Sequence, residues 1–173
     1  MVIDLETTGL NPEEDEIIEF GAMKMIGHER TDTFNAIIMC EKSVPVSISR
    51  LTGIDNQMLR ETGEPLNEVL IHFSEFVGDL PIVGHNIDFD RSFLLCSCAK
   101  CGCPAIVNRY VDTLSLARRL IKGVENYKLE TLVARFGIES NGTHRSIRDC
   151  DLTALLYKKL INMIDADSKD TAI

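Results

Sequence analysis

The feature that most constrains the fold is the order of the apolar segments along the chain. Residues 2–5 form a short apolar strand candidate, and residues 7–9 (Thr-Thr-Gly) follow it as a turn signal. Segments 17–25 and 33–40 are rich in β-branched and apolar residues and are separated by a polar stretch. Two such segments are typical of a β-hairpin. The chain is therefore predicted to begin with three antiparallel strands.

After this start, one-sided helices alternate with short strands. Apolar residues recur at helical spacing over 66–77, and Gly78 ends that pattern. Brief apolar segments at 81–84 and 110–111 are strand candidates. Further helices are predicted over 89–101, 113–120, 129–136 and 152–163. This order indicates an α/β fold in which helices pack on one mixed five-stranded sheet.

Length and composition set the broad class. The chain has 173 residues, of which 45% are hydrophobic, enough for one domain with a substantial core. The longest apolar run covers 36–40, too short to cross a bilayer, and the first residues lack the pattern of a signal peptide. We expect a soluble, cytoplasmic protein with one domain over 1–164 and a polar tail over 165–173.

The charge balance restricts how the protein could bind nucleic acid. Lys and Arg number 18 and Asp and Glu number 27, which gives a net charge of −9. That balance disfavours a broad basic face for duplex DNA. It leaves open an enzyme that grips a few nucleotides and uses metal ions to neutralise phosphates. The basic residues nearest the polar motifs either steer a short strand or are solvated surface charges: Arg91, Lys128, Arg145 and Arg148.

Two acids interrupt the apolar first strand. Asp4 and Glu6 are two positions apart, so their side chains leave a strand on the same face, about 6.6 Å apart at Cα. Burying two like charges together costs several kcal/mol unless a cation compensates them. Carboxylates without soft ligands nearby favour Mg²⁺ or Mn²⁺. The alternative is a solvated edge strand.

Two further acids and a histidine stand at predicted helix starts. Asp90 lies in the first turn of the helix after 81–84, where the helix dipole favours a carboxylate, and Asp88 is expected to be the cap. Asp149 lies three residues before Leu152 and shares its sheet-facing side. His144 lies in the preceding loop, either as a functional base or as a solvated bystander.

The six cysteines are expected to be reduced thiols in an intracellular chain. Four of them cluster as Cys96, Cys98, Cys101 and Cys103. Their spacing raises a metal or redox site as one alternative. A helix that ends near Cys101, with Gly102 as its C-cap, makes packing or incidental thiols the preferred interpretation.

Three motifs in order resemble those of a known family. They are the first-strand motif over 2–10, His85-Asn86-x-x-Phe89-Asp90, and His144-Arg145-x-x-x-x-Asp149. Together they resemble the DnaQ-like 3′→5′ exonucleases of the DEDDh type, and the chain looks similar to the DNA polymerase III epsilon subunit and the PolC-type exonuclease domain. The resemblance implies an RNase H-like fold and stepwise release of 5′-mononucleotides from a 3′ end.

The resemblance also assigns roles to individual residues. Four acids would hold two Mg²⁺ or Mn²⁺ ions: Asp4, Glu6, Asp90 and Asp149. His144 would be the general base, since an ordinary histidine can accept a proton at neutral pH. Residues that flank the metal site either contact the terminal nucleotide or act only as turn and cap residues: Thr7, Thr8, His85 and Asn86.

The implied substrate is a single-stranded or frayed 3′ end of DNA. The implied process is proofreading or repair, with a DNA polymerase III catalytic subunit as partner. Two alternatives stay open: the same chemistry on RNA, as in oligoribonuclease-like or RNase T-like relatives, and a non-catalytic module that docks a polymerase. Thr52 stands where epsilon relatives carry a histidine, so no substrate contact is transferred to it. Ser146 and Cys150 replace small alanines of the third motif, with little expected effect.

Overall fold

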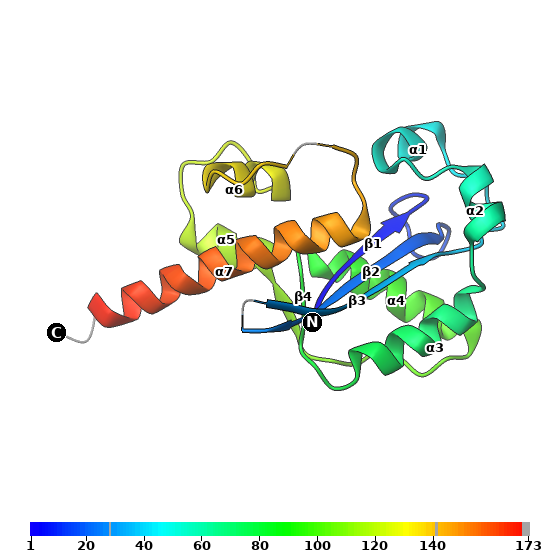
Figure 1. Ribbon diagram of the computed structural model, residues 1–173, viewed down its shortest axis with the longest axis horizontal. Coiled ribbons are helices and arrows are strands. Elements are labelled where there is room, and N and C mark those ends of the chain that lie inside the picture. The colour runs from blue at the N-terminus through cyan, green and yellow to red at the C-terminus, as the bar shows by residue number, and fades with distance from the viewer. Residues whose placement is uncertain (28, 141, 171–173) are drawn as a thin grey trace.

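The computed structural model describes residues 1–27, 29–140 and 142–170. These residues form a mixed five-stranded sheet in the order β3-β2-β1-β4-β5 (Figure 1). The first three strands are antiparallel neighbours, while β4 runs parallel to β1 and β5 parallel to β4. The strands are β1 (Val2–Thr7), β2 (Ile17–Ile26), β3 (Glu29–Ile37), β4 (Ile82–Gly84) and β5 (Tyr110–Asp112). The predicted α/β class and mixed sheet are confirmed.

Helices cover both faces of this sheet, and the alternation within β1 explains why. Ile3 and Leu5 pack on one face with Phe73 of α3 and Phe93 of α4. Val2 lies on the other face, in the cluster that includes Cys150 of α7. The helices are α1 (Val46–Thr52), α2 (Asn56–Thr62), α3 (Leu66–Val77), α4 (Ile87–Cys101), α5 (Thr113–Leu120), α6 (Leu129–Arg135) and α7 (Ser146–Asp170).

The hairpin differs in its limits from the prediction. Strand β2 extends to Ile26, one residue past its predicted limit, and β3 begins at Glu29, inside the polar stretch that was expected to separate the two strands. At the far end, β3 stops at Ile37, before the predicted limit at Cys40. Polar residues in this region stay in the ladder because their side chains are exposed on the edge strand, where only the backbone must pair.

Two short helices, α1 and α2, were not predicted. Each has seven residues and few buried side chains, so its apolar pattern is too short to recognise. Pro45 precedes α1, and Asp55 caps α2 by accepting a hydrogen bond from the backbone N–H of Met58. In Figure 1, α1 and α2 lie next to the carboxyl end of β1.

The last helix is longer than its apolar pattern. Helix α7 continues without a break through residue 165, where a polar tail was predicted to begin, and ends at Asp170. Residues 171–173 of that predicted tail lie outside the described residues. The boundary at 164 therefore stays a prediction. None of the described helices has the length and apolar content required to traverse a bilayer.

Candidate active site

The first two acids meet a third at the carboxyl end of β1. Asp4 and Glu6 leave β1 on the face covered by α7, and Asp149 lies in the first turn of that helix. One carboxylate oxygen from each of these three residues lies within 4.8 Å of the others. The predicted juxtaposition of the first and third motifs is present. Hard oxygen donors at this separation suit a divalent cation such as Mg²⁺ or Mn²⁺.

Asp90 reaches the same strand through a gap in the sheet. Strand β4 ends at Gly84, so it pairs with β1 only near Val2. The backbone N–H of Leu5 then donates to Oδ1 of Asp90, at 3.0 Å, in place of a strand partner. Asp90 is 4% exposed, which is rare for an aspartate. The fourth acid is thereby fixed to the β1 backbone at the residue between Asp4 and Glu6.

The electrostatics of this acid cluster favour a bound cation. Burial, and then the charges of Asp90 and Glu6, raise the pKa of Asp4 well above its usual value. Burial, and then the charge of Asp149, raise the pKa of Glu6 to about 8. Burial also raises the pKa of Asp90 to about 7 and that of Asp149. Four carboxyls that resist ionisation without a cation are the donor set expected for a metal site.

His144 lies between two carboxylates rather than free in solvent. Its Nδ1 is 3.1 Å from Oδ2 of Asp149, on the side of the acid cluster. Its Nε2 is 2.7 Å from Oε1 of Glu130, which lies in the first turn of α6. The side chains of His144 and Glu130 are 34% and 44% exposed, so solvent reaches both. Sequence reasoning missed Glu130, because an acid in a helical first turn is common and carries no signal.

A second missed residue is Glu19, the cross-strand partner of Glu6. Its side chain is 1% exposed and accepts hydrogen bonds from Arg145, Asn35 and the backbone N–H of Ser146. Arg145 therefore holds β2 against the start of α7. The signal was available: a glutamate inside the apolar segment Ile17-Ile18-Glu19-Phe20 needs a partner.

Thr7 is the last residue of β1 and Thr8 follows it at the start of the turn, and both are buried. The hydroxyl of Thr7 donates to the carbonyl of Gly9. The hydroxyl of Thr8 accepts from the backbone N–H of Glu16 and lies 3.5 Å from the Asp15 carboxylate. The interpretation as turn residues is supported by these bonds, and their contact with a nucleotide stays a prediction.

His85 and Asn86 stand at the start of α4. Both ring nitrogens of His85 are occupied, Nδ1 by the Thr113 hydroxyl and Nε2 by the carbonyl of Tyr127, each at 2.9 Å. His85 therefore ties β4 to the segment before α6. Asn86 is exposed, occupies the N-cap position with a positive φ of 63°, and lines the cleft beside the acids. Nucleotide contact by either residue stays a prediction.

The expectation that Asp88 caps α4 is wrong. Asp88 lies inside the first turn, and its side chain is 88% exposed beside Arg91. Asp112 of β5 serves the start of α4 instead, since its carboxylate accepts from the backbone N–H groups of Asn86 and Ile87. The same carboxylate also caps α5, by accepting from the backbone N–H groups of Leu114 and Ser115. A cap supplied by a distant strand leaves no local sequence signal.

A cleft of about 810 Å³ opens over these residues. Asp4, His144 and Asp149 line it, together with Leu51 of α1 and Glu130 of α6. Lys128 lines the cleft, as does Arg118 of α5, which sequence reasoning did not single out. Of the other basic candidates, Arg91 lies over the Tyr110 ring. A cleft with acids and two cations can hold a short anionic strand.

The clustered cysteines lie away from these acids, at the far end of α4. Cys98 is buried in the core, while Cys96, Cys101 and Cys103 are half-buried. The Cys103 thiol lies 3.9 Å from the carbonyl oxygens of Asn67 and Cys101. These positions are compatible with packing thiols, and the choice between that role and a metal or redox site stays open.

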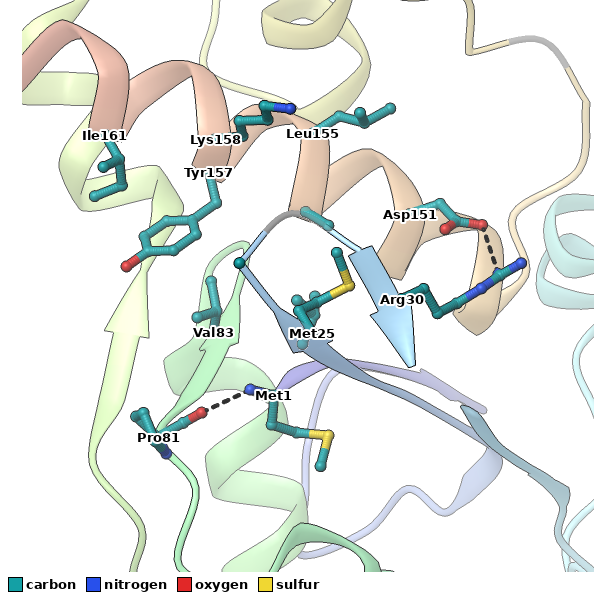
Figure 2. Close-up of a pocket in the computed structure, with 13 residues that line it drawn as sticks. Met1, Met25, Arg30, Pro81, Val83, Asp151, Leu155, Tyr157, Lys158 and Ile161 are labelled. Carbon is teal, nitrogen blue, oxygen red and sulfur yellow. Dashed lines mark hydrogen bonds and ion pairs between the residues drawn. The ribbon is translucent and has the colours of Figure 1, made fainter. Parts of the chain in front are cut away.

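A second cavity, of about 590 Å³, opens at the other end of β1 (Figure 2). Met25, Val83 and Tyr157 line it, and the amino group of Met1 donates to the carbonyl of Pro81 at its edge. An ion pair between Arg30 and Asp151 also lies in its lining, as Figure 2 shows. This lining is mainly apolar and has Asp151 as its acid, whereas several acids meet at the cleft beside His144. The cleft beside His144 is therefore the better candidate for the active site.

Comparison with known proteins agrees with this geometry. A protein family described as exonuclease matches residues 1–157. The DNA polymerase III epsilon subunit of Aquifex aeolicus is 37% identical over 162 residues, which cover 93% of this chain and 79% of that protein. The PolC-type DNA polymerase III of Caldanaerobacter subterraneus is 38% identical over 165 residues, covering 95% of this chain and only 12% of that protein.

Solved structures show the same architecture. Exonuclease X, in complex with 5′ overhanging duplex DNA, superposes with a TM-score of 0.74 at 23% identity. The match covers 93% of this chain and 90% of that one. The predicted RNase H-like fold is thereby confirmed.

Proposed function

We propose that this chain, which belongs to the exonuclease family, removes 5′-mononucleotides one at a time from the 3′ end of DNA during proofreading. The observation that carries the proposal is the cluster of Asp4, Glu6 and Asp149, whose carboxylate oxygens lie within 4.8 Å of one another beside His144. Burying several acids together destabilises the fold, and a bound divalent cation offsets that cost by neutralising their charges.

The residues present fit two Mg²⁺ or Mn²⁺ ions. All four acids offer hard oxygen donors, and the thiol of Cys150 nearby is turned to the carbonyl of Gly21. We assign the ions to Asp4, Glu6, Asp90 and Asp149. When bound, such ions supply the positive charge that activates an attacking water and stabilises the departing 3′-oxygen.

The chain's own residues supply the rest of the reaction. His144 takes the proton of the attacking water, because its ring nitrogen Nδ1 faces the acid cluster. Arg118 and Lys128 neutralise phosphates along the cleft, and Leu51 offers an apolar contact for a base. A DNA strand in this cleft meets these two local positive charges, so the negative net charge of the whole chain does not prevent binding.

The partner we propose is the catalytic subunit of DNA polymerase III. Support comes from the relatives: one is named as the epsilon subunit of that polymerase and another as its PolC-type form. The chain covers 79% of the first relative but 12% of the second, so in that second case it corresponds to a small part of a larger protein.

The proposal is tested with a 5′-labelled single-stranded DNA oligonucleotide and its RNA counterpart, each incubated with Mg²⁺, Mn²⁺ or EDTA. We expect a ladder that shortens from the 3′ end, requires metal, and forms faster on DNA. Asp90→Asn should abolish it, whereas the matched variant Asp88→Asn, two positions away and exposed, should not. A faster RNA ladder would make the chain a ribonuclease, and no ladder would reject the enzymatic function.

A further inference from the structure

Glu130 is a side-chain contact of His144 that the proposed reaction does not use. Its Oε1 lies 2.7 Å from Nε2 of His144, closer than the 3.1 Å between Nδ1 and Asp149. Both groups are partly shielded from solvent, so the contact is not a fully hydrated surface pair. A carboxylate on one imidazole nitrogen fixes the tautomer and orientation of the ring.

The two partners of this contact are held by independent anchors. Glu130 lies on α6, whose Leu132 and Val133 are fully buried in a cluster with Leu156 of α7. The start of α6 is further fixed by Asn126, whose side-chain oxygen accepts from the Lys128 N–H and the Thr131 hydroxyl. Glu130 is thus presented by a rigid element rather than by a free loop.

On the other side, the backbone of His144 is fastened to α1. Its N–H donates to the carbonyl of Leu51 at 3.0 Å. The next residue, Arg145, is bound to Glu19 of β2. With the backbone fixed, the remaining freedom of His144 is rotation of its side chain, and Glu130 is placed to restrict that rotation.

We infer that Glu130 is a positioning residue for His144, an inference that rests on the proposed function. The Glu130 carboxylate holds the Nε2 side of the ring, and this contact keeps Nδ1 turned towards Asp149 and the acid cluster. As the water oxygen bonds to phosphorus and the bond to the 3′-oxygen breaks, the water's proton passes to Nδ1. The resulting imidazolium stays in contact with the Glu130 carboxylate through Nε2.

The test is a double-mutant cycle measured as kcat and KM on single-stranded DNA. In the wild-type background, Glu130→Ala should lower kcat by about 10–100-fold with KM changed less than about threefold. In the His144→Ala background, Glu130→Ala should lower kcat by less than about twofold, because the group it orients is gone. The conservative Glu130→Asp should recover part of the rate, and Glu125→Gln, an exposed acid nearby, controls for loss of charge.

A second readout separates orientation from folding. In metal-free protein, the ¹H–¹³C NMR signals of the His144 ring should report a single side-chain orientation, and Glu130→Ala should broaden or split them while thermal unfolding stays near wild type. An equal loss of kcat from Glu130→Ala in both backgrounds, or unchanged kcat and ring signals, would overturn the inference. The proposed function fails separately, if the wild-type protein shows no metal-dependent shortening of DNA.

Discussion

Two glutamates that face each other across neighbouring strands behave in opposite ways. Glu6 of β1 and Glu19 of β2 are register partners, and both are largely withdrawn from solvent. Burial raises the pKa of Glu6 to about 8. Burial alone would also raise the pKa of Glu19, but hydrogen bonds from Arg145, Ser146 and Asn35 lower it below its usual value.

The difference teaches how to separate a structural acid from a functional one. Glu19 is supplied with donors by the fold, and these bonds join β2, β3 and the start of α7. Glu6 faces other acids, of which Asp149 contributes the strongest repulsion. A buried carboxylate that has acidic neighbours and no hydrogen-bond donors from the protein indicates a binding site for an external cation.

The largest expected effect comes from neutralising the functional member of the pair. Glu6→Gln should lower exonuclease activity by at least about 10³-fold, because several kcal/mol of metal-dependent transition-state stabilisation is lost. The same variant should unfold at a higher temperature than wild type in EDTA at pH 7, since glutamine removes the cost of burying an acid that is ionised in the unfolded chain. Activity assays and thermal unfolding on the same sample check both. If Glu6→Gln were less stable than wild type, Glu6 would stabilise the fold as Glu19 does, and the distinction between the two residues would be wrong.

The second effect concerns the structural member. Glu19→Ala should reduce the free energy of unfolding by about 2 kcal/mol, because the Ser146 N–H and the Arg145 guanidinium lose their acceptor. This figure lies below that for a fully buried pair, since Arg145 is 39% exposed. Urea unfolding in EDTA measures it, with Glu29→Ala on the exposed edge strand as the control.

The third effect is a pH dependence with opposite signs for the two sites. Between their usual pKa values and about 7–8, Asp90 and Glu6 hold protons in the folded protein that the unfolded chain has released. Stability should therefore fall as pH rises from 5 to 8, with a Tm decrease on the order of 5 °C. Glu19, whose pKa is lowered, adds stability that is lost only on acidification below its usual pKa.

Scanning calorimetry across this pH range, with EDTA and with excess Mg²⁺, measures that dependence. Mg²⁺ should raise the Tm more at pH 8 than at pH 5, because cation binding competes with protons for the same carboxylates. A Tm in EDTA that rises steadily from pH 5 to 8 would contradict the assignment of raised pKa values to the acid cluster.

The smallest effect is expected at Ser146. Its hydroxyl is fully buried and lies 3.2 Å from the side-chain nitrogen of Asn35. That nitrogen also donates to Glu19 and to the carbonyl of Phe20, so Ser146→Ala should cost less than about 1 kcal/mol and leave activity near wild type. Urea unfolding checks the first point. A larger loss would mean that the network around Glu19 depends on this hydroxyl.

Much of the fold could be predicted from local pattern. The helix over 66–77 and the brief strand at 81–84 follow from spacing and turn chemistry, and the structure confirms both as α3 and β4. Asp4 and Glu6 could be placed on one face because strand alternation fixes it. Asp149 could be placed by its spacing from Leu152 on one helix face.

What could not be predicted depends on contacts between distant segments. Glu130 reaches His144 only because α6 packs on α7, and Asp112 caps α4 from another strand. The cap assigned to Asp88 failed for the same reason. Helices α1 and α2 lack an apolar pattern of sufficient length, so their positions came only with the structure.

The most direct test of the central account is calorimetric titration of Mn²⁺ into metal-free protein at pH 8. The account predicts saturable binding at the acid cluster that Glu6→Gln weakens by at least about tenfold, while Asp88→Asn binds as wild type does. Binding that is unchanged in Glu6→Gln would contradict the claim that the unpartnered acids of β1 form the metal site.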